Sequence, residues 1–568
     1  MSERDERLTR RWWDALLIAL ISAGAAVSSQ RWTGFASPDS EFYATLALFG
    51  DEVTARSEPA YTWTRLGYIA PVRFLVTTVD PWLGFEIWRV LLIVMIVGSV
   101  YAMVRLLSTR QLAVIIASFA ALNTVVLSFV GTTYLTGTIL AALLLFVALG
   151  AWRTVGAPRR PAVVSLLSGG VAAWLVMLNP YALLLGLTMW LGLRSIALVT
   201  DGRRRWVLLL RDVLTAAAGF LVIFVMHLIA GLAIFNGRNW FTTYLEWNST
   251  LDYSSFIGDA TTWQRDIALL IPLIAVGVAV VAAIATRSRG SAAALVVSVG
   301  SIGFTVVYLV LVPGPWLEAP TYVAKLWPGA LAGIALGFGA LVGRRPLGLV
   351  GWLVAAAFVP LLLWSGRWDR DVPVAVGVLI GLAVLALVVL AALALRRPGT
   401  TPGALVVVLA LGSLAVGAQV LQNGRGLLGT YGQFPFRAAF VDFDTELLMR
   451  SKVAAEEFVL ANTMPGEKLM TWTDADRLTA GIAGMQLWGW YNNVPEEAVL
   501  TPAGASTLAE QRPDAIAMYA PTREQIDAFH GSLPPWSLPT DPVCTTVPFL
   551  GIGSPEAHVC VTRLTWVG

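Results

Sequence analysis

Long runs of apolar residues recur along most of the chain and are separated by short polar segments. A helix needs about 17–25 mostly apolar residues to cross a bilayer, because no backbone group can go without a hydrogen bond in the hydrocarbon core. About thirteen runs reach this length, at 13–29, 88–107, 111–130, 134–152, 162–178, 181–199, 212–235, 266–286, 292–312, 324–342, 347–365, 374–395 and 403–422. The pattern predicts a polytopic α-helical membrane protein with about thirteen transmembrane helices.

Arginine residues test this number of helices, because cytoplasmic loops carry an excess of basic residues. With the N-terminus in the cytoplasm, the cytoplasmic loops contain Arg110; Arg153, Arg159 and Arg160; Arg203, Arg204 and Arg205; Arg287 and Arg289; Arg344 and Arg345; and Arg396 and Arg397. One helix more or fewer would place about half of them outside. Tryptophans near predicted helix ends fit an aromatic belt, namely Trp12, Trp13, Trp88, Trp152, Trp263, Trp316 and Trp327.

The N-terminal segment has a second interpretation. Arg7, Arg10 and Arg11 precede an apolar run that ends in small residues, which is also typical of a cleaved signal peptide. Removal of this span would break the alternation of arginine-bearing loops, so we expect it to remain as the first transmembrane helix.

Three regions are predicted to lie outside the membrane: 30–87, 236–265 and the stretch after about Leu421. The third has its own pattern, with helices expected at 445–461 and 522–531 and strands at 468–472, 514–519, 545–550 and 558–564. We therefore expect a transmembrane domain over 1–422, which includes the first external loop 30–87, and a small extracytoplasmic α/β domain over 423–568.

The only cysteines, Cys544 and Cys560, both lie in this C-terminal stretch and flank its last predicted pair of strands. In an oxidising compartment they would form one disulfide. Two free buried thiols are the alternative.

Composition supports the membrane assignment. Hydrophobic residues make up 57% of the 568 residues and charged residues 13%, against about 45–50% and 25% in soluble globular domains. The formal net charge is +3 and no run of basic residues offers a surface for nucleic acid. Basic residues are almost all arginine in a chain rich in Ala and Gly, which suggests a GC-rich bacterial genome and the bacterial cytoplasmic membrane, with the C-terminal domain outside.

The segment from Ser37 to Tyr43 carries the most informative polar residues. It follows the first predicted span closely, so Asp39 and Glu41 should lie near the outer membrane surface. Ser37 fits an N-cap and Pro38 the first turn of a helix, where acidic residues are favoured by the helix dipole. Helix capping alone would explain these carboxylates.

An acidic residue in this PDSxxY-like setting after the first membrane helix resembles the first external loop of the GT-C glycosyltransferases. The long loop with Arg65 and the Gly67–Pro71 stretch, the multi-span core and the external C-terminal domain are similar as well. The resemblance implies transfer of a sugar from a polyprenyl-phosphate donor. It also implies that Asp39 acts as general base on the acceptor hydroxyl or binds a metal.

A carboxylate suits this chemistry, because a sugar hydroxyl is a poor nucleophile and a positioned base accelerates its attack by about 10²–10⁴-fold. Direct displacement at the anomeric carbon would invert its configuration. Glu41 is the second candidate base, although in a helix it points about 200° away from Asp39. Tyr43 shares the face of Asp39 and is a candidate substrate ligand.

The donor phosphate needs a cation near the outer membrane face. Lys325 is the only lysine in the membrane portion and precedes a predicted span, so it is the main candidate, with a snorkelling interface lysine as the alternative. Tyr322 could share its helix face. Glu318, Arg65 and Arg238 are further candidate substrate ligands.

Metal ligands are scarce. Some GT-C enzymes place a second acidic residue between the third and fourth spans, but Gly131–Tyr134 contains none. We therefore expect no tightly bound cofactor or metal, although a divalent metal is possible at the site.

Two other functions compete with a glycosyltransferase. A transporter or flippase of a lipid-linked saccharide would place ionisable groups near mid-membrane and repeat its two halves, and the spans have neither feature apart from His227. A glycan polymerase or ligase would need more external arginines than Arg238 and Arg265 provide. The expected partners are a polyprenyl-phosphate-linked sugar, a cell-envelope glycan, lipid or protein acceptor, and membrane lipid, but no nucleic acid.

Overall fold

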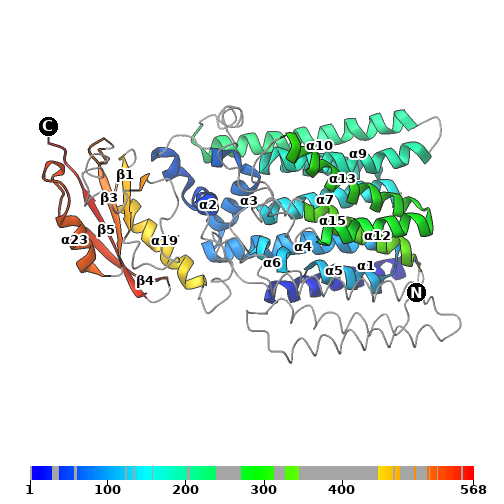
Figure 1. Cartoon of the computed structure of the whole chain (residues 1–568), viewed down its shortest axis with the longest axis horizontal. Coiled ribbons are helices and arrows are strands. Elements are labelled where there is room, and N and C mark those ends of the chain that lie inside the picture. Colours follow the sequence, from blue (N-terminus) through cyan, green and yellow to red (C-terminus); the bar gives the residue numbers. More distant parts are fainter. Residues whose placement is uncertain are drawn as a thin grey trace, which may run out of the picture.

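The chain folds into a bundle of long helices with a small sheet domain at one end. The computed structural model describes residues 3–28, 38–56, 61–121, 124–131, 135–156, 158–200, 205–237, 270–311, 326–344, 445–464, 467–473, 492–493, 508–510, 512–520, 522–551 and 554–567. The bundle helices run along the long axis of the molecule, and the chain begins at the end of the bundle opposite the sheet (Figure 1). We call the bundle end beside the sheet the domain end, and the other the N-terminal end.

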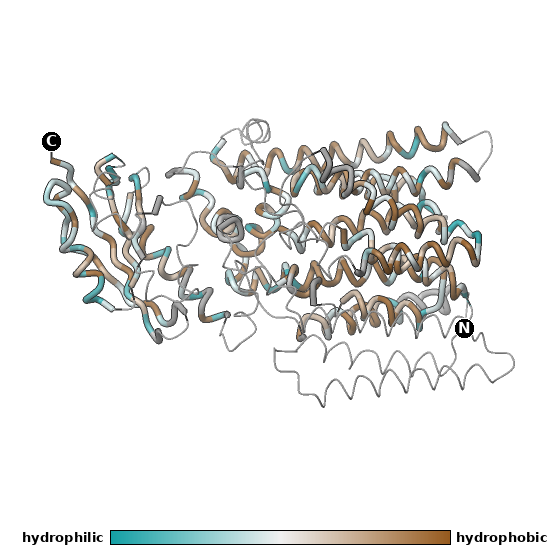
Figure 2. Tube along the Cα trace, in the orientation of Figure 1, coloured by the Kyte–Doolittle hydropathy of each residue, from teal (hydrophilic) through white to brown (hydrophobic). Residues whose placement is uncertain are grey.

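Most predicted spans coincide with helices. These are α1 (Glu3–Ser28), α4 (Pro81–Leu107), α5 (Arg110–Ala121) with α6 (Thr124–Val130), α7 (Thr136–Val155), α8 (Pro161–Leu178), α9 (Pro180–Thr200), α10 (Arg205–Ile234), α12 (Leu270–Thr286), α13 (Arg289–Leu311) and α15 (Trp327–Val342). Among described residues, α4, α7, α8 and α10 are long and apolar enough to cross a membrane. Apolar residues dominate these helices (Figure 2). The predicted spans 347–365, 374–395 and 403–422 lie outside the described residues.

One predicted boundary differs from the structure. Within the predicted span 111–130 the structure describes α5, which ends at Ala121, and α6, which begins at Thr124, while residues 122–123 lie outside the described residues. The second span begins at Pro81 instead of 88, where the Asp80 carboxylate accepts a hydrogen bond from the backbone N–H of Leu83 and Pro81 occupies the first helical turn. Hydropathy averaged over a window does not detect a capped helix start.

The first external loop is itself helical. It contains α2 (Pro38–Arg56), the 3-10 turn η1 (Tyr61–Thr64) and α3 (Leu66–Thr78), which lie between the bundle and the sheet (Figure 1). Sequence analysis did not predict α3, because it is too short to span and contains Pro71.

Pro71 is tolerated because its missing hydrogen bond is replaced. Proline has no N–H to donate to the carbonyl four residues earlier, which here is Gly67. The indole Nε1–H of Trp174 in α8 donates to that carbonyl over 2.7 Å. Gly67 also lies so close to α8 that a Cβ would be about 2.9–3.0 Å from atoms of Met177 and Leu178. The hydrogen bond from Trp174 and the close approach of Gly67 therefore both hold α3 against the end of α8.

Two clusters of ion pairs lie at the N-terminal end of the bundle. In the Asp212 cluster, the buried Asp212 carboxylate of α10 pairs with Arg194 at 2.6 Å and Arg153 at 3.0 Å, and the Ser165 hydroxyl donates to it at 3.2 Å. Four helices converge on one carboxylate.

The Asp14 cluster is built in the same way. The Asp14 carboxylate of α1 accepts hydrogen bonds from the Tyr101 hydroxyl at 2.8 Å and from Arg110 at 2.7 Å, and Arg105 lies 3.6 Å away. It joins α1 to α4 and α5.

The C-terminal domain contains a five-stranded sheet in the order β2-β1-β3-β5-β4. The strands are β1 (Leu469–Thr473), β2 (Asn492–Asn493), β3 (Ala515–Ala520), β4 (Val543–Gly551) and β5 (Ser554–Arg563). β1 pairs in parallel with β2 and β3, whereas β5 is antiparallel to both β3 and β4. Apart from the short β2, each strand overlaps one predicted from the sequence.

The sheet is covered on both faces. Helix α19 (Thr445–Ala461) lies on the side of the bundle and α23 (Arg523–Gly531) on the far side (Figure 1). Consecutive residues of β3 alternate between two apolar clusters, and the one that includes α19 is continuous with the core of the bundle. On that face, the Tyr519 hydroxyl lies 3.3 Å from the buried Glu456 carboxylate, and burial raises the pKa of Tyr519 well above its ordinary value.

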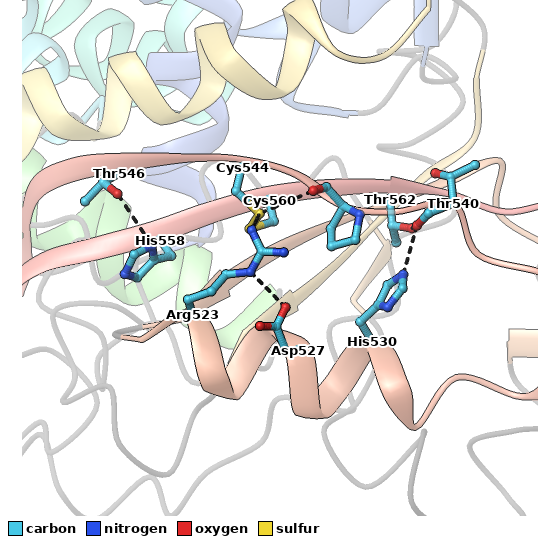
Figure 3. Close-up of a disulfide and its surroundings, with 10 residues drawn as sticks. Arg523, Asp527, His530, Thr540, Cys544, Thr546, His558, Cys560 and Thr562 are labelled. Carbon is cyan, nitrogen blue, oxygen red and sulfur yellow. Dashed lines mark hydrogen bonds and ion pairs between the residues drawn. A yellow bond between two sulfur atoms is a disulfide. The ribbon is translucent and has the colours of Figure 1, made fainter.

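Cys544 and Cys560 face each other across β4 and β5 and are joined by a disulfide bond. The side chain of Arg523, which pairs with Asp527 at 2.8 Å, lies against the two sulfur atoms (Figure 3).

One described ion pair joins the C-terminal domain to the bundle. Arg450 of α19 donates to both carboxylate oxygens of Asp80, at 2.7 and 3.2 Å, and also pairs with Glu446. The hydrogen bond from Arg450 lowers the pKa of Asp80 below its ordinary value. Asp80 thus caps α4 and holds α19 at once. The predicted domain boundary at 422 lies outside the described residues.

Candidate active site

The candidate site lies where α2 begins. The helix starts at Pro38, so its first turn contains Asp39 and Glu41, whose side chains lie outside the described residues. From Tyr43 to Ala47 every side chain is buried. A helix with no solvent-facing side in this stretch is enclosed by its neighbours. The candidate base therefore lies in the helical turn that precedes this buried stretch.

A row of aromatic side chains connects α2 to the bundle. The ring of Tyr43 contacts Tyr68 of α3 edge-on with centroids 6.1 Å apart, and Tyr68 contacts Trp88 of α4 at 6.5 Å. Trp88 in turn contacts Trp174 of α8 at 6.3 Å. All but the partly buried Trp174 are at most 6% exposed. We call these four residues the aromatic row.

Two polar atoms in the aromatic row have no hydrogen-bond partner among the described residues. They are the hydroxyl of Tyr68 and the indole nitrogen of Trp88. Trp174 differs, because its nitrogen donates to the backbone at Gly67. A buried donor left unsatisfied costs about 1–3 kcal/mol, and buried Tyr and Trp usually find a partner.

Trp88 and Trp327 correct the predicted aromatic belt. Both are buried in protein, at 6% and 0% exposure, whereas Trp12, Trp13 and Trp152 are exposed. Position near a helix end does not separate a tryptophan that faces lipid from one that faces a neighbouring helix.

Arg65 precedes α3 directly. Its carbonyl accepts the backbone N–H groups of Tyr68 and Ile69, at 2.9 and 3.1 Å, and so starts the helix. Its side chain is half-buried. The structure therefore brings two sequence-predicted ligands, Tyr43 and Arg65, to the same pair of packed helices.

The remaining predicted ligands lie outside the described residues: Glu318, Tyr322, Lys325 and Arg238. Lys325 is next to Leu326, which is buried and precedes α15. Arg238 is next to Gly237, just beyond the end of α10.

Metal ligands do not converge in the part of the chain that the structure describes. No group of three or more His, Cys, Asp or Glu side chains there could hold a metal ion.

Sequence reasoning missed Tyr68, Trp88 and Trp174 as members of the site. A usable signal was present for Tyr68, which lies in the Gly67–Pro71 stretch already singled out. No sequence signal identified Trp174, because its indole N–H donates to the Gly67 carbonyl, which lacks a helical donor only because residue 71 is proline.

Comparison with known proteins gives structural neighbours only. No family model and no curated protein matches the chain. Among solved structures, the chain is similar to ArnT from Cupriavidus metallidurans bound to undecaprenyl phosphate, with 16% identity, a TM-score of 0.49 and coverage of 97% of this chain and 98% of that one. It is also similar to the apo oligosaccharyltransferase of Archaeoglobus fulgidus, with 10% identity, a TM-score of 0.43 and coverage of 90% and 70%.

Proposed function

We propose that the protein is an inverting, GT-C-like membrane glycosyltransferase. It would transfer one sugar from a polyprenyl-phosphate donor to a cell-envelope glycan, lipid or protein acceptor on the outer face of a bacterial cytoplasmic membrane. The supporting observation is the position of α2. The helix that carries Asp39 in its first turn follows α1 closely and is enclosed at the domain end of the bundle.

In this proposal Asp39 takes the proton of the acceptor hydroxyl as its oxygen attacks the anomeric carbon of the donor. The new glycosidic bond forms on one face while the bond to the phosphate oxygen breaks on the other, which inverts the configuration. Polyprenyl phosphate leaves as an anion, so it needs positive charge and hydrogen-bond donors instead of an acid. Lys325 is the proposed cation, with Arg65 and Arg238 as alternatives and Tyr322 and Glu318 as further substrate contacts.

The buried stretch from Tyr43 to Ala47 supports this role for a carboxylate in the preceding turn. Electrostatic interactions are stronger where water is excluded, and a fixed base needs no reorganisation during the reaction. An acid that only capped an exposed helix would not need five consecutive buried residues after it.

The test is a transfer assay with purified full-length protein and a panel of labelled polyprenyl-phosphate sugars, run with a mixed envelope extract as acceptor. We expect turnover of one donor and release of polyprenyl phosphate. Parallel reactions with a chelator and with added Mg²⁺ or Mn²⁺ test the expected independence from metal. Movement of intact lipid-linked sugar across vesicles, without cleavage, would support the flippase alternative and contradict transfer.

A further inference from the structure

The unsatisfied donors of the aromatic row require an explanation. Serine and threonine hydroxyls inside helices can rotate onto the carbonyl three or four residues earlier. The polar atoms of Tyr68 and Trp88 cannot, because their rings carry them away from their own backbone. Both are buried at the domain end and their rings are in contact.

We infer that the Tyr68 hydroxyl and the Trp88 indole N–H bind phosphate oxygens of the polyprenyl-phosphate donor. This inference rests on the proposed function for the identity of the ligand. An indole nitrogen only donates hydrogen bonds. An ionised phosphate only accepts them, whereas a sugar hydroxyl does both. The donor set therefore fits phosphate better than sugar.

The surroundings fit the same ligand. Arg65 lies three residues before Tyr68, directly before the same helix, and is the basic residue nearest to Tyr68 in the sequence. In a site this enclosed, hydrogen bonds to a charged phosphate are stronger than bonds between neutral groups.

Tyr68 is buried, so a ligand reaches its hydroxyl only if a neighbouring side chain moves, and Tyr43 packs edge-on against its ring. Helix α2 has a kink about which Tyr43 could move. Phe49 has non-helical backbone angles, φ −124° and ψ 31°, and divides the helix into two parts. Displacement of the half before Phe49 would uncover Tyr68 while α3 and α4 stay packed.

The matched control is Tyr101, a second buried tyrosine. It lies in the same helix as Trp88 but near the C-terminal end of that helix, which is at the N-terminal end of the bundle. Its hydroxyl is already satisfied by Asp14 at 2.8 Å. Tyr68→Phe removes an unsatisfied hydroxyl and Tyr101→Phe a satisfied one. The ring is kept in both.

The experiment measures binding of a labelled polyprenyl phosphate to full-length protein in nanodiscs, with the neutral polyprenol of the same length and inorganic phosphate as further probes. We expect Tyr68→Phe to weaken polyprenyl-phosphate affinity about 10-fold or more. Polyprenol affinity should be unchanged, and the melting temperature unchanged or higher. Tyr101→Phe should lower the melting temperature and leave the affinity unchanged. Trp88→Phe provides a second test, in which the affinity for polyprenyl phosphate should again fall while the affinity for polyprenol stays unchanged.

Unchanged polyprenyl-phosphate affinity in both Tyr68→Phe and Trp88→Phe would overturn the inference, as would equal losses for phosphate and polyprenol. Full displacement of the lipid by inorganic phosphate at low concentration would assign a free-phosphate site and also overturn it. The proposed function is tested separately. Tyr68-dependent binding without sugar transfer would support the phosphate site and contradict the proposed function. Sugar transfer that neither variant changes would support the proposed function and contradict the phosphate site.

Discussion

The two ends of the helical bundle differ in the kinds of side chain that meet there. At the N-terminal end, the described polar side chains of the Asp14 and Asp212 clusters pair with one another across several helices. At the domain end, the aromatic row is assembled from rings, and two of its polar atoms have no partner among the described residues.

This contrast separates a structural role from a binding role. A buried charge is tolerated only when it is paired and hydrogen-bonded, and the Asp212 carboxylate meets that condition with the protein's own side chains. Buried hydrogen-bond donors without a partner, such as those of Tyr68 and Trp88, lower the free energy of unfolding when no ligand is bound. Such a cost is expected at functional sites, where residues are arranged for a substrate and not for the fold. The following predictions test this division, from the largest expected effect to the smallest.

Asp212→Asn should be the most damaging substitution to stability. It would leave Arg153 and Arg194 partly or fully buried with no neutralising carboxylate in the cluster, a change that typically costs about 3–5 kcal/mol. The measurement is the melting temperature in detergent, together with the yield of folded protein. Transfer activity per folded molecule should be retained, and an unchanged melting temperature would show that the cluster does not support the bundle.

Asp39→Asn should reduce transfer activity and leave stability unchanged. It keeps the helix start and the size of the side chain but removes the base, so transfer should fall by about 10²-fold or more. Donor binding and melting temperature should be unchanged. Glu41→Gln is the matched control and should have a smaller effect. Near-normal turnover in Asp39→Asn would show that Asp39 is not the base and would assign it only a helix-capping role.

Lys325→Met should weaken donor affinity about 10–100-fold, because a charge-assisted bond to phosphate is worth about 1.5–3 kcal/mol. Lys325→Arg should retain part of the affinity. Equilibrium binding of polyprenyl phosphate to the two variants gives the comparison. A lower melting temperature with unchanged affinity would identify a snorkelling lysine and leave Arg65 or Arg238 as the phosphate ligand.

Arg450→Gln should have the smallest effect, about 0.2–1 kcal/mol, since the pair with Asp80 is largely exposed. Because the pKa of Asp80 is lowered in the folded protein, its contribution is complete at neutral pH and is lost only as the pH falls through that lowered value. Protection factors for hydrogen exchange in α19, which are corrected for the intrinsic pH dependence of amide exchange, should therefore be constant from pH 8 to about pH 5. Asp80→Ala should cost more than Arg450→Gln, because it also removes the cap of α4.

The sequence predicted long elements well and the composition of the site poorly. Helix α19 was predicted with its observed bounds, and β3 and β5 to within a few residues, because each has a clear period and a turn signal beside it. The presence of α3 was missed because Pro71 argues against a helix unless its lost hydrogen bond is replaced, and the replacement comes from Trp174, about a hundred residues later. Such long-range compensation has no local pattern.

The candidate site divides in the same way. Asp39 was identified from the resemblance of its short segment to a GT-C first external loop, and Tyr43 from its place four residues later on the same helix face, and both are local features. Tyr68 and Trp88 became candidates only when the structure showed which of the buried polar atoms have partners. Burial can be predicted from hydropathy, whereas hydrogen-bond satisfaction depends on contacts between helices far apart in sequence.

The position of β5 governs the order in which the C-terminal sheet can assemble. β5 follows β4 in the chain but lies between β3 and β4, and its register pairs Ala515 with Arg563. Until β5 is in place, β3 has an open edge and β4 lacks the strand with which it pairs. Pairing across such a sequence separation is intrinsically slow, and an open strand edge invites pairing with other chains. A nascent protein would therefore present this edge until residues 554–563 have emerged, so we expect misassembly during biogenesis to begin in the sheet and not in the bundle.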